Sequence, residues 1–152
     1  MSQNFDMLAA LIVASLLLSA GCSSGSSSVS SSDDLATRAA MSVLSEFYGD
    51  YLQSHKGHPP KDSADFHKYL ESRSEDLNIY NVDSPDQLFT SSRDGKPLVI
   101  VCGKRLAPAD SPGTPWAAYE QMGVDGKRFA VRVHGGIHEL SDDEIAQIFR
   151  NN

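Results

Sequence analysis

The feature that most constrains this chain is an apolar run near its start, from Met7 to Leu18, in which Ser15 is the only polar residue. A membrane-spanning helix needs about 20 apolar residues, so this run is too short to span a bilayer but suits the core of an export signal. A Ser-rich run follows, from Ser23 to Ser32; it cannot bury apolar area and predicts a flexible tether. The fold must therefore come from the rest of the chain.

Three small residues, Ser19, Ala20 and Gly21, stand directly before Cys22. This arrangement resembles the lipobox of bacterial lipoproteins. The resemblance implies that residues 1–21 are a signal peptide and that Cys22 is acylated on sulfur, with fatty acids such as palmitate, and becomes the mature N-terminus. A tether over 22–33 and one globular domain over 34–152 complete the predicted organisation.

The first six residues, Met1 to Asp6, depart from this pattern because they contain no Lys or Arg. Export signals normally begin with positive charge, so either the true start lies elsewhere or the signal is a poor one. Two alternatives stay open, a retained membrane-anchor helix and a plain secretory signal. By resemblance to Gram-negative lipoproteins, Ser23 in place of Asp favours the outer membrane over the inner membrane, with the domain facing the periplasm.

The charge of the chain limits its partners. The 152 residues carry a formal charge of −7 and no cluster of Lys or Arg. Such a surface argues against nucleic acid and against electrostatic binding to lipid. We therefore expect membrane attachment through the acyl groups on Cys22, with room for a protein partner in the cell envelope. Cys102 ends the apolar run Leu98–Cys102, so we expect a buried, inert thiol in a strand.

Apolar spacing of three and four predicts a long amphipathic helix over residues 34–54, capped by Asp33 or Asp34. A shorter helix is predicted from Ser63 to about residue 73, with Ser63 as its N-cap. Leu77–Val82 alternates weakly, which predicts an edge strand or an extended loop.

The second half of the chain has the pattern of strands. Three or four are predicted, over residues 98–102, 116–122 and 129–133, with a brief pairing at residues 137–140 as the open fourth. Asp125-Gly126 has the composition of a hairpin turn, and Ser141-Asp-Asp-Glu144 that of a capping box before a short last helix. The sequence thus predicts an α+β domain in which helices pack on one face of a small antiparallel meander.

Two further resemblances concern the globular part. The long helix, the break Gly57-His-Pro59 and the following meander resemble the globular heads of type II secretion pseudopilins. That resemblance implies an accessory component of a secretion or pilus system, although the pseudopilin cleavage site is absent. Phe89–Gly95 and Ala118–Arg128 are similar to segments of small uncharacterised bacterial lipoproteins, which imply no activity.

Two pairs of histidines could in principle form a zinc site, namely His55 with His58 and His134 with His138. Each pair straddles glycine, so neither lies on a regular helix, and we expect loop histidines in solvent. Ser141 and the acidic residues after it are explained by capping.

Trp116 and Tyr119 would fall on opposite faces of a regular strand, one in the core and one free to join a surface patch. We expect no catalytic residue, metal site or cofactor. The expected function is a non-catalytic binding or scaffolding lipoprotein, ahead of the pseudopilin-like accessory and of a metal-dependent enzyme.

Overall fold

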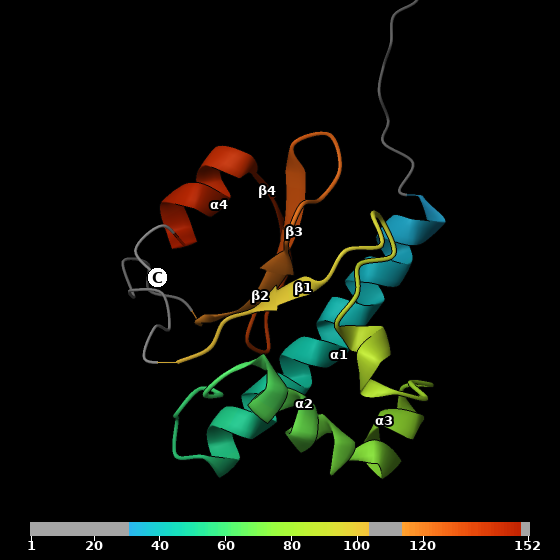
Figure 1. Ribbon diagram of the computed structural model, residues 1–152, viewed down its shortest axis with the longest axis vertical. Helices are drawn as coiled ribbons and strands as arrows, with labels where there is room; N and C mark the ends of the chain where they lie inside the picture. The colour runs from blue at the N-terminus through green and yellow to red at the C-terminus, as the bar shows by residue number, and fades with distance from the viewer. Residues whose placement is uncertain (1–30, 104–113, 150–152) are drawn as a thin grey trace, which may run out of the picture.

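The computed structural model describes residues 31–103 and 114–149. Its elements, in chain order, are α1 (Ser32–Ser54), α2 (Ser63–Glu71), α3 (Ser74–Ile79), the 3₁₀ helix η1 (Pro85–Leu88), β1 (Leu98–Ile100), β2 (Trp116–Glu120), β3 (Lys127–Arg132), β4 (Ile137–Ser141) and α4 (Asp142–Phe149). This confirms the predicted α+β class. Figure 1 shows the sheet between α4 and the long diagonal helix α1, with α2 and α3 beside the second half of α1. None of the helices in the described ranges has the length and apolar character needed to cross a membrane.

α1 begins earlier than the sequence predicted. The side chain of Ser31 accepts a hydrogen bond from the backbone N–H of Asp34 at 3.1 Å, so Ser31 is the N-cap in place of Asp33 or Asp34. The two aspartates lie in the first turn, where their charge is favourable beside the positive end of the helix. The end of the predicted tether is therefore part of the fold. The buried face of α1 comprises Thr37, Met41, Leu44, Ser45, Phe47, Tyr48, Gly49 and Tyr51.

The prediction of a strand or extended loop at Leu77–Val82 is wrong, because Leu77 belongs to α3. The left-handed residue Asn81 (φ 56°) ends this helix, and the backbone N–H of Val82 bonds to the carbonyl of Leu77 at 3.2 Å. The turn buries both Leu77 and Val82, which are five residues apart and would face opposite sides of a strand. The cap of α2 also differs from the prediction, since Asp62, rather than Ser63, accepts from the backbone N–H of Asp65.

The four strands form one antiparallel sheet in the order β1-β2-β3-β4, which confirms the predicted meander. Asp125 (φ 51°) and Gly126 (φ 69°) form the β2–β3 turn, as the sequence indicated. Val124 and Lys127 close this turn by exchanging two backbone hydrogen bonds of 2.9 Å. β1 and β2 are each two residues shorter than predicted, ending at Ile100 and Glu120.

The helices cover both faces of the sheet, so the prediction of helices on one face is wrong. Along β3, Phe129 and Val131 belong to the larger core under α1, whereas Ala130 between them packs with Ile145 of α4. This alternation is the ordinary two-residue period of a strand. α4 is short, but it contacts β3 and β4 and buries Ala130 on the second side of the sheet, while Leu140 of β4 is only partly covered.

The Ser31 cap gives a first prediction. Ser31→Ala removes the acceptor for the Asp34 N–H and should lower the free energy of unfolding by about 1 kcal/mol. Ser32→Ala is the matched control, because the exposed Ser32 hydroxyl has just one hydrogen bond to another described residue, to Asp33 at 3.5 Å, and its loss should change stability little. Urea unfolding of the two variants measures the difference. Equal effects of both substitutions would contradict the assignment of Ser31 as the cap.

Candidate functional site

The residue with the strongest predicted role, Cys22, lies outside the described residues, as do residues 1–21 and the tether up to residue 30. The site of lipidation therefore stays a prediction. The other candidate residues from the sequence lie within the fold, and the structure places each of them.

Cys102 is half-buried and lies just beyond the end of β1. The next residue, Gly103, donates its backbone N–H to the carbonyl of Pro60 at 2.7 Å, which ties this strand end to the loop before α2. Burial, together with the negative charges of Asp62 and Asp65, raises the pKa of the Cys102 thiol to about 11. The prediction of a buried thiol within a strand is therefore wrong, since Cys102 lies outside β1 and is only half-buried. A reactive cysteine needs an environment that lowers its thiol pKa, so the raised pKa agrees with the predicted lack of reactivity.

The histidines of the second pair point to different sides of the sheet. Nδ1 of His134 lies 2.9 Å from Oε2 of Glu46 on α1, and the ring sits where any side chain on Gly49 would collide with it. His138 pairs with Ala130 in the register, and its ring meets the Trp116 ring edge-on at 5.4 Å.

In the first pair, the ring of His55 stacks on that of Tyr51 at 3.8 Å, while His58 is exposed. Within residues 31–103 and 114–149, no three His, Cys, Asp or Glu side chains form a cluster suited to a metal ion.

Trp116 and Tyr119 face the same side of the sheet, contrary to the prediction. The register shifts between Trp116 and Ala118, and an extra residue in a strand reverses the alternation beyond it. Both rings consequently pack against the ring of Phe149 on α4, with ring centroids 6.1 Å apart for Trp116 and 4.1 Å apart for Tyr119. They are part of the smaller core and do not form a separate surface patch.

The capping box is confirmed. The backbone N–H and the hydroxyl of Ser141 both donate to Oε2 of Glu144 at 2.7 Å, and the Glu144 N–H returns to the hydroxyl at 3.3 Å. These bonds lower the pKa of the Glu144 carboxyl, the backbone N–H most strongly. Asp142 pairs with Arg128 at 2.6 Å. These groups hold the start of α4, so their acidity has a structural explanation.

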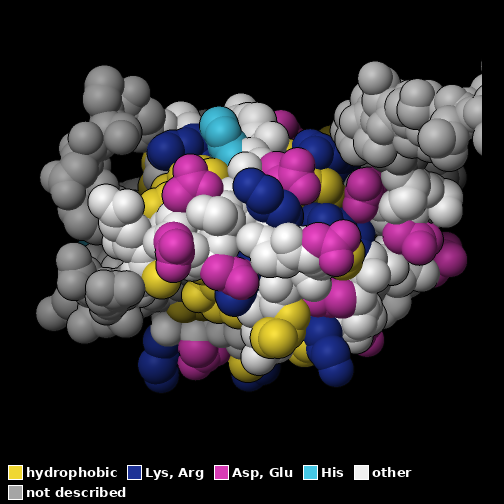
Figure 2. All heavy atoms as spheres, turned by 90° about the horizontal axis from the view of Figure 1, so that it is seen from above, with side chains coloured by type: hydrophobic (Ala, Val, Ile, Leu, Met, Phe, Trp, Pro, Cys, Tyr) yellow, Lys and Arg dark blue, Asp and Glu magenta, His cyan; other side chains and the backbone are white. Residues whose placement is uncertain are grey.

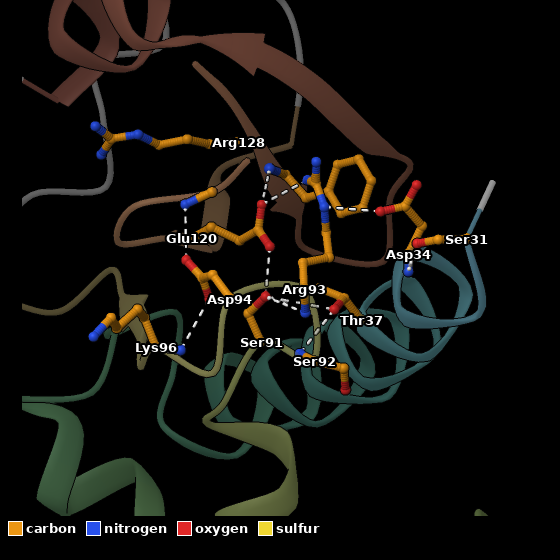
Figure 3. A network of polar contacts seen from close by, with 12 residues as sticks. Ser31, Asp34, Thr37, Ser91, Ser92, Arg93, Asp94, Lys96, Glu120 and Arg128 are labelled. Carbon is orange, nitrogen blue, oxygen red and sulfur yellow. Dashed lines mark hydrogen bonds and ion pairs between the residues drawn. The ribbon is translucent and has the colours of Figure 1, made fainter. Parts of the chain in front are cut away.

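The most elaborate polar site was not predicted from the sequence; it surrounds Glu120 at the end of β2 (Figure 3). Glu120 is fully buried. Its carboxylate accepts three hydrogen bonds, from the hydroxyl of Ser91 at 2.6 Å, from Nη1 of Arg93 at 2.9 Å and from the backbone N–H of Phe129 at 2.7 Å. A buried carboxylate requires such partners, because removing an ion from water is costly.

Arg93 connects Glu120 to the first turn of α1. Its side chain is 6% exposed, and Nε lies 2.8 Å from Oδ1 of Asp34. The Nε–H is not directed at that oxygen, so this contact is an ion pair without a well-aligned hydrogen bond. The guanidinium carbons of Arg93 and of Arg38 each lie 4.0 Å from the centroid of the Phe129 ring, within cation–π distance.

Further hydrogen bonds surround this ion pair and hold the loop that carries Arg93. The Ser92 backbone N–H donates to the hydroxyl of Thr37 on α1 at 3.0 Å. Asp94 accepts from the backbone N–H groups of Lys96 and Gly123, at 2.9 and 3.0 Å, and so joins the loop to the segment after β2. The whole network, called here the Glu120 network, joins α1, the loop 91–96 and the sheet.

The arrangement is suited to holding the fold together. Both oxygens of Glu120 accept hydrogen bonds from groups of the chain. The nearly buried side chain of Arg93 faces two carboxylates, those of Glu120 and Asp34. A general acid or base must reach the proton that it transfers, whereas Glu120 is shielded from any substrate. The signal in the sequence was weak, because a single acidic residue at the end of a strand does not reveal its burial.

Comparisons of the chain with protein-family models, with curated proteins and with solved structures found no match.

The Glu120 network predicts a large loss of stability when one partner is removed. Arg93→Met should lower the free energy of unfolding by about 3 kcal/mol or more, because it leaves the Glu120 carboxylate buried without its cation. Lys96→Met is the matched control on the same loop, since Lys96 is exposed and only its backbone takes part in the network. Chemical unfolding measures both variants.

The same experiment has an internal test of coupling. Arg93→Met combined with Glu120→Gln should cost less than the two single changes added together, because the second change removes the charge that the first left unpaired. Additive effects, or an Arg93→Met variant as stable as Lys96→Met, would show that the ion pair does not stabilise the fold.

The raised thiol pKa predicts slow alkylation of Cys102. With Cys22→Ser in place, Cys102 is the only cysteine, and near pH 8 iodoacetamide should modify it roughly a hundredfold more slowly in the folded chain than in urea. Mass spectrometry follows the reaction, and equal rates in both states would contradict the assigned environment.

The same pKa shift makes stability depend on pH. Because folding raises this pKa, the thiol contributes stability below its ordinary pKa of about 8.5, and that contribution is lost as the pH rises toward 11.

Proposed function

We propose that this protein is a lipid-anchored component of a bacterial cell envelope that binds or scaffolds another molecule without catalysis. The observation that carries the proposal is the order of features before the fold. An apolar run ends in small residues and Cys22, and only Ser, Gly and one Val stand between Cys22 and the Ser31 cap of α1.

The described fold is compatible with being presented on such a tether. Nine positions separate Cys22 from Ser31 (31 − 22), and an extended chain covers at most about 3.6 Å per residue, so the domain would stay within roughly 30 Å of its anchor. The entry point is firmly held, because Asp34 in the first turn of α1 pairs with the buried Arg93. The domain would therefore follow its anchor closely and would be held near the membrane surface.

The absence of catalysis is proposed from the chemistry of the polar groups. Glu120, Ser141 and Glu144 are occupied by partners that support helices and strands, and the Cys102 thiol is held in its neutral form. Function must be argued from a site, and the polar groups described above are engaged in stabilising the fold. Binding is thus favoured over reaction.

A pseudopilin-like accessory of a secretion or pilus system is the second candidate. It is favoured by the order of a long first helix, short helices and an antiparallel meander. Deleting the gene would distinguish the candidates, because a secretion accessory is required for export of its cargo and a general scaffold is not.

Acylation at Cys22 is the decisive test of the first candidate. Cells grown with labelled palmitate should label the wild-type protein, and Cys22→Ser should abolish the label and release the protein from the membrane fraction, since each buried CH₂ contributes about 0.8 kcal/mol. Cys102→Ser is the matched control and should keep both label and location. Equal labelling of wild type and Cys22→Ser would exclude a lipid anchor at this residue.

A further inference from the structure

The end of α3 carries two consecutive apolar side chains in solvent. Ile79 is 76% exposed and Tyr80 is 47% exposed. The turn that carries them has a defined conformation, because Asn81 is left-handed and the backbone N–H of Val82 donates a hydrogen bond to the carbonyl of Leu77. Tyr80 also rests edge-on against the Phe47 ring of α1, 5.9 Å between centroids. The turn therefore holds Ile79 and Tyr80 in a fixed position before any partner arrives.

The charge around these side chains is strongly acidic. From Glu71 to Asp86 the chain has five Asp or Glu and one Arg, a net charge of −4 (1 − 5) out of −7 for the whole chain. The single cation, Arg73, is already paired with Asp76 at 2.5 Å and lies 3.9 Å from Asp50.

Two of these acidic residues remain without a cation. Glu75 stands one helical turn before Ile79, and Asp83 stands three residues after Tyr80. Both are exposed, and neither takes part in an ion pair in the part of the chain that the structure describes. By contrast, Figure 2 shows Lys and Arg interspersed with Asp and Glu over another end of the molecule.

From these observations we propose that the α3 turn, defined by Glu75, Ile79, Tyr80 and Asp83, is a docking site for a basic segment of another protein. The partner segment would place an apolar side chain against Ile79 and Tyr80, and its Lys or Arg residues beside Glu75 and Asp83. Two exposed apolar side chains, with Glu75 and Asp83 close to them in sequence and in no ion pair of the described residues, are complementary to that combination.

The same charge disfavours the two other occupants. A second copy of this chain would bring a net charge of −4 against −4, which is repulsive. A bilayer with anionic headgroups would repel the acidic turn as well. The α3 turn also lies away from the start of α1, where the proposed tether joins (Figure 1). Phe47, which contacts Tyr80, follows Ser31 by 16 positions, or about 24 Å of helix.

A fluorescein-labelled peptide of Lys, Leu and Ser is a direct probe, and the same peptide with Glu for Lys is its control. Fluorescence anisotropy with the purified full chain should show binding of the Lys peptide that weakens with added salt, and little binding of the Glu peptide. Ile79→Ser should weaken binding at least about tenfold, because it removes the apolar contact. Met122→Ser, at another side chain that is 57% exposed, should leave it unchanged.

The charge requirement has its own matched pair. Glu75→Gln with Asp83→Asn should weaken binding severalfold, whereas Asp125→Asn with Asp143→Asn removes the same charge elsewhere and should have little effect. Equal weakening by both pairs, or no binding of the Lys peptide, would overturn the proposal. Ile79-dependent binding to phosphatidylethanolamine–phosphatidylglycerol vesicles, or Ile79-dependent self-association in sedimentation, would replace it with a lipid surface or a second copy. None of these readouts needs acylation, so they are independent of the proposed anchor.

Discussion

The buried ion pair between Glu120 and Arg93 is the interaction on which the arrangement of this domain depends. A carboxylate at full burial is tolerated only when cation and hydrogen-bond donors meet it with good geometry. Those donors come from the loop 91–96 and from the backbone of β3, so the loop and the strand must arrive together. A slip of β2 by one residue would turn Glu120 to the other face of the sheet, away from Arg93. The ion pair thus selects one register.

That selection extends to α1 and to the start of the fold. Arg93 reaches Asp34 in the first turn, and Thr37 accepts from the loop backbone one turn later. The N-terminal part of the helix is therefore held by polar contacts, while its second half is held mainly by packing in the larger core. In that half, the hydroxyl of Tyr48 also donates a hydrogen bond to the carbonyl of Val101. A force applied to the chain before Ser31 would act on the part of α1 that Asp34 and Thr37 connect to the Glu120 network. This is a suitable place for a tether to join.

Local patterns predicted most of this fold, and the failures have identifiable causes. The long helix, the Asp125-Gly126 turn, the meander and the capping box each follow from spacing or from one residue's conformational preference, so the sequence was sufficient. Trp116 and Tyr119 were misplaced because a register shift inside β2 leaves no mark in the alternation of residue types. Leu77 was misplaced because its partner in burial, Val82, is reached only through a left-handed turn at Asn81.

The polar sites show the same limit more sharply. Ser91, Arg93 and Glu120 are separated by as many as 29 residues, and the Glu120 network exists only after β2 and the loop are in place. Its residues come from three separate parts of the chain, so no local sequence pattern could predict the network. The α3 turn differs, because its residues are close in sequence and what was needed from the structure was their exposure. Leu77 and Val82 already fill the core beneath it, so the fold gains little from an exposed isoleucine there. Glu75 and Asp83 lie close to it in sequence and take part in no ion pair of the described residues, so contact with another protein explains the exposed isoleucine more readily than folding does.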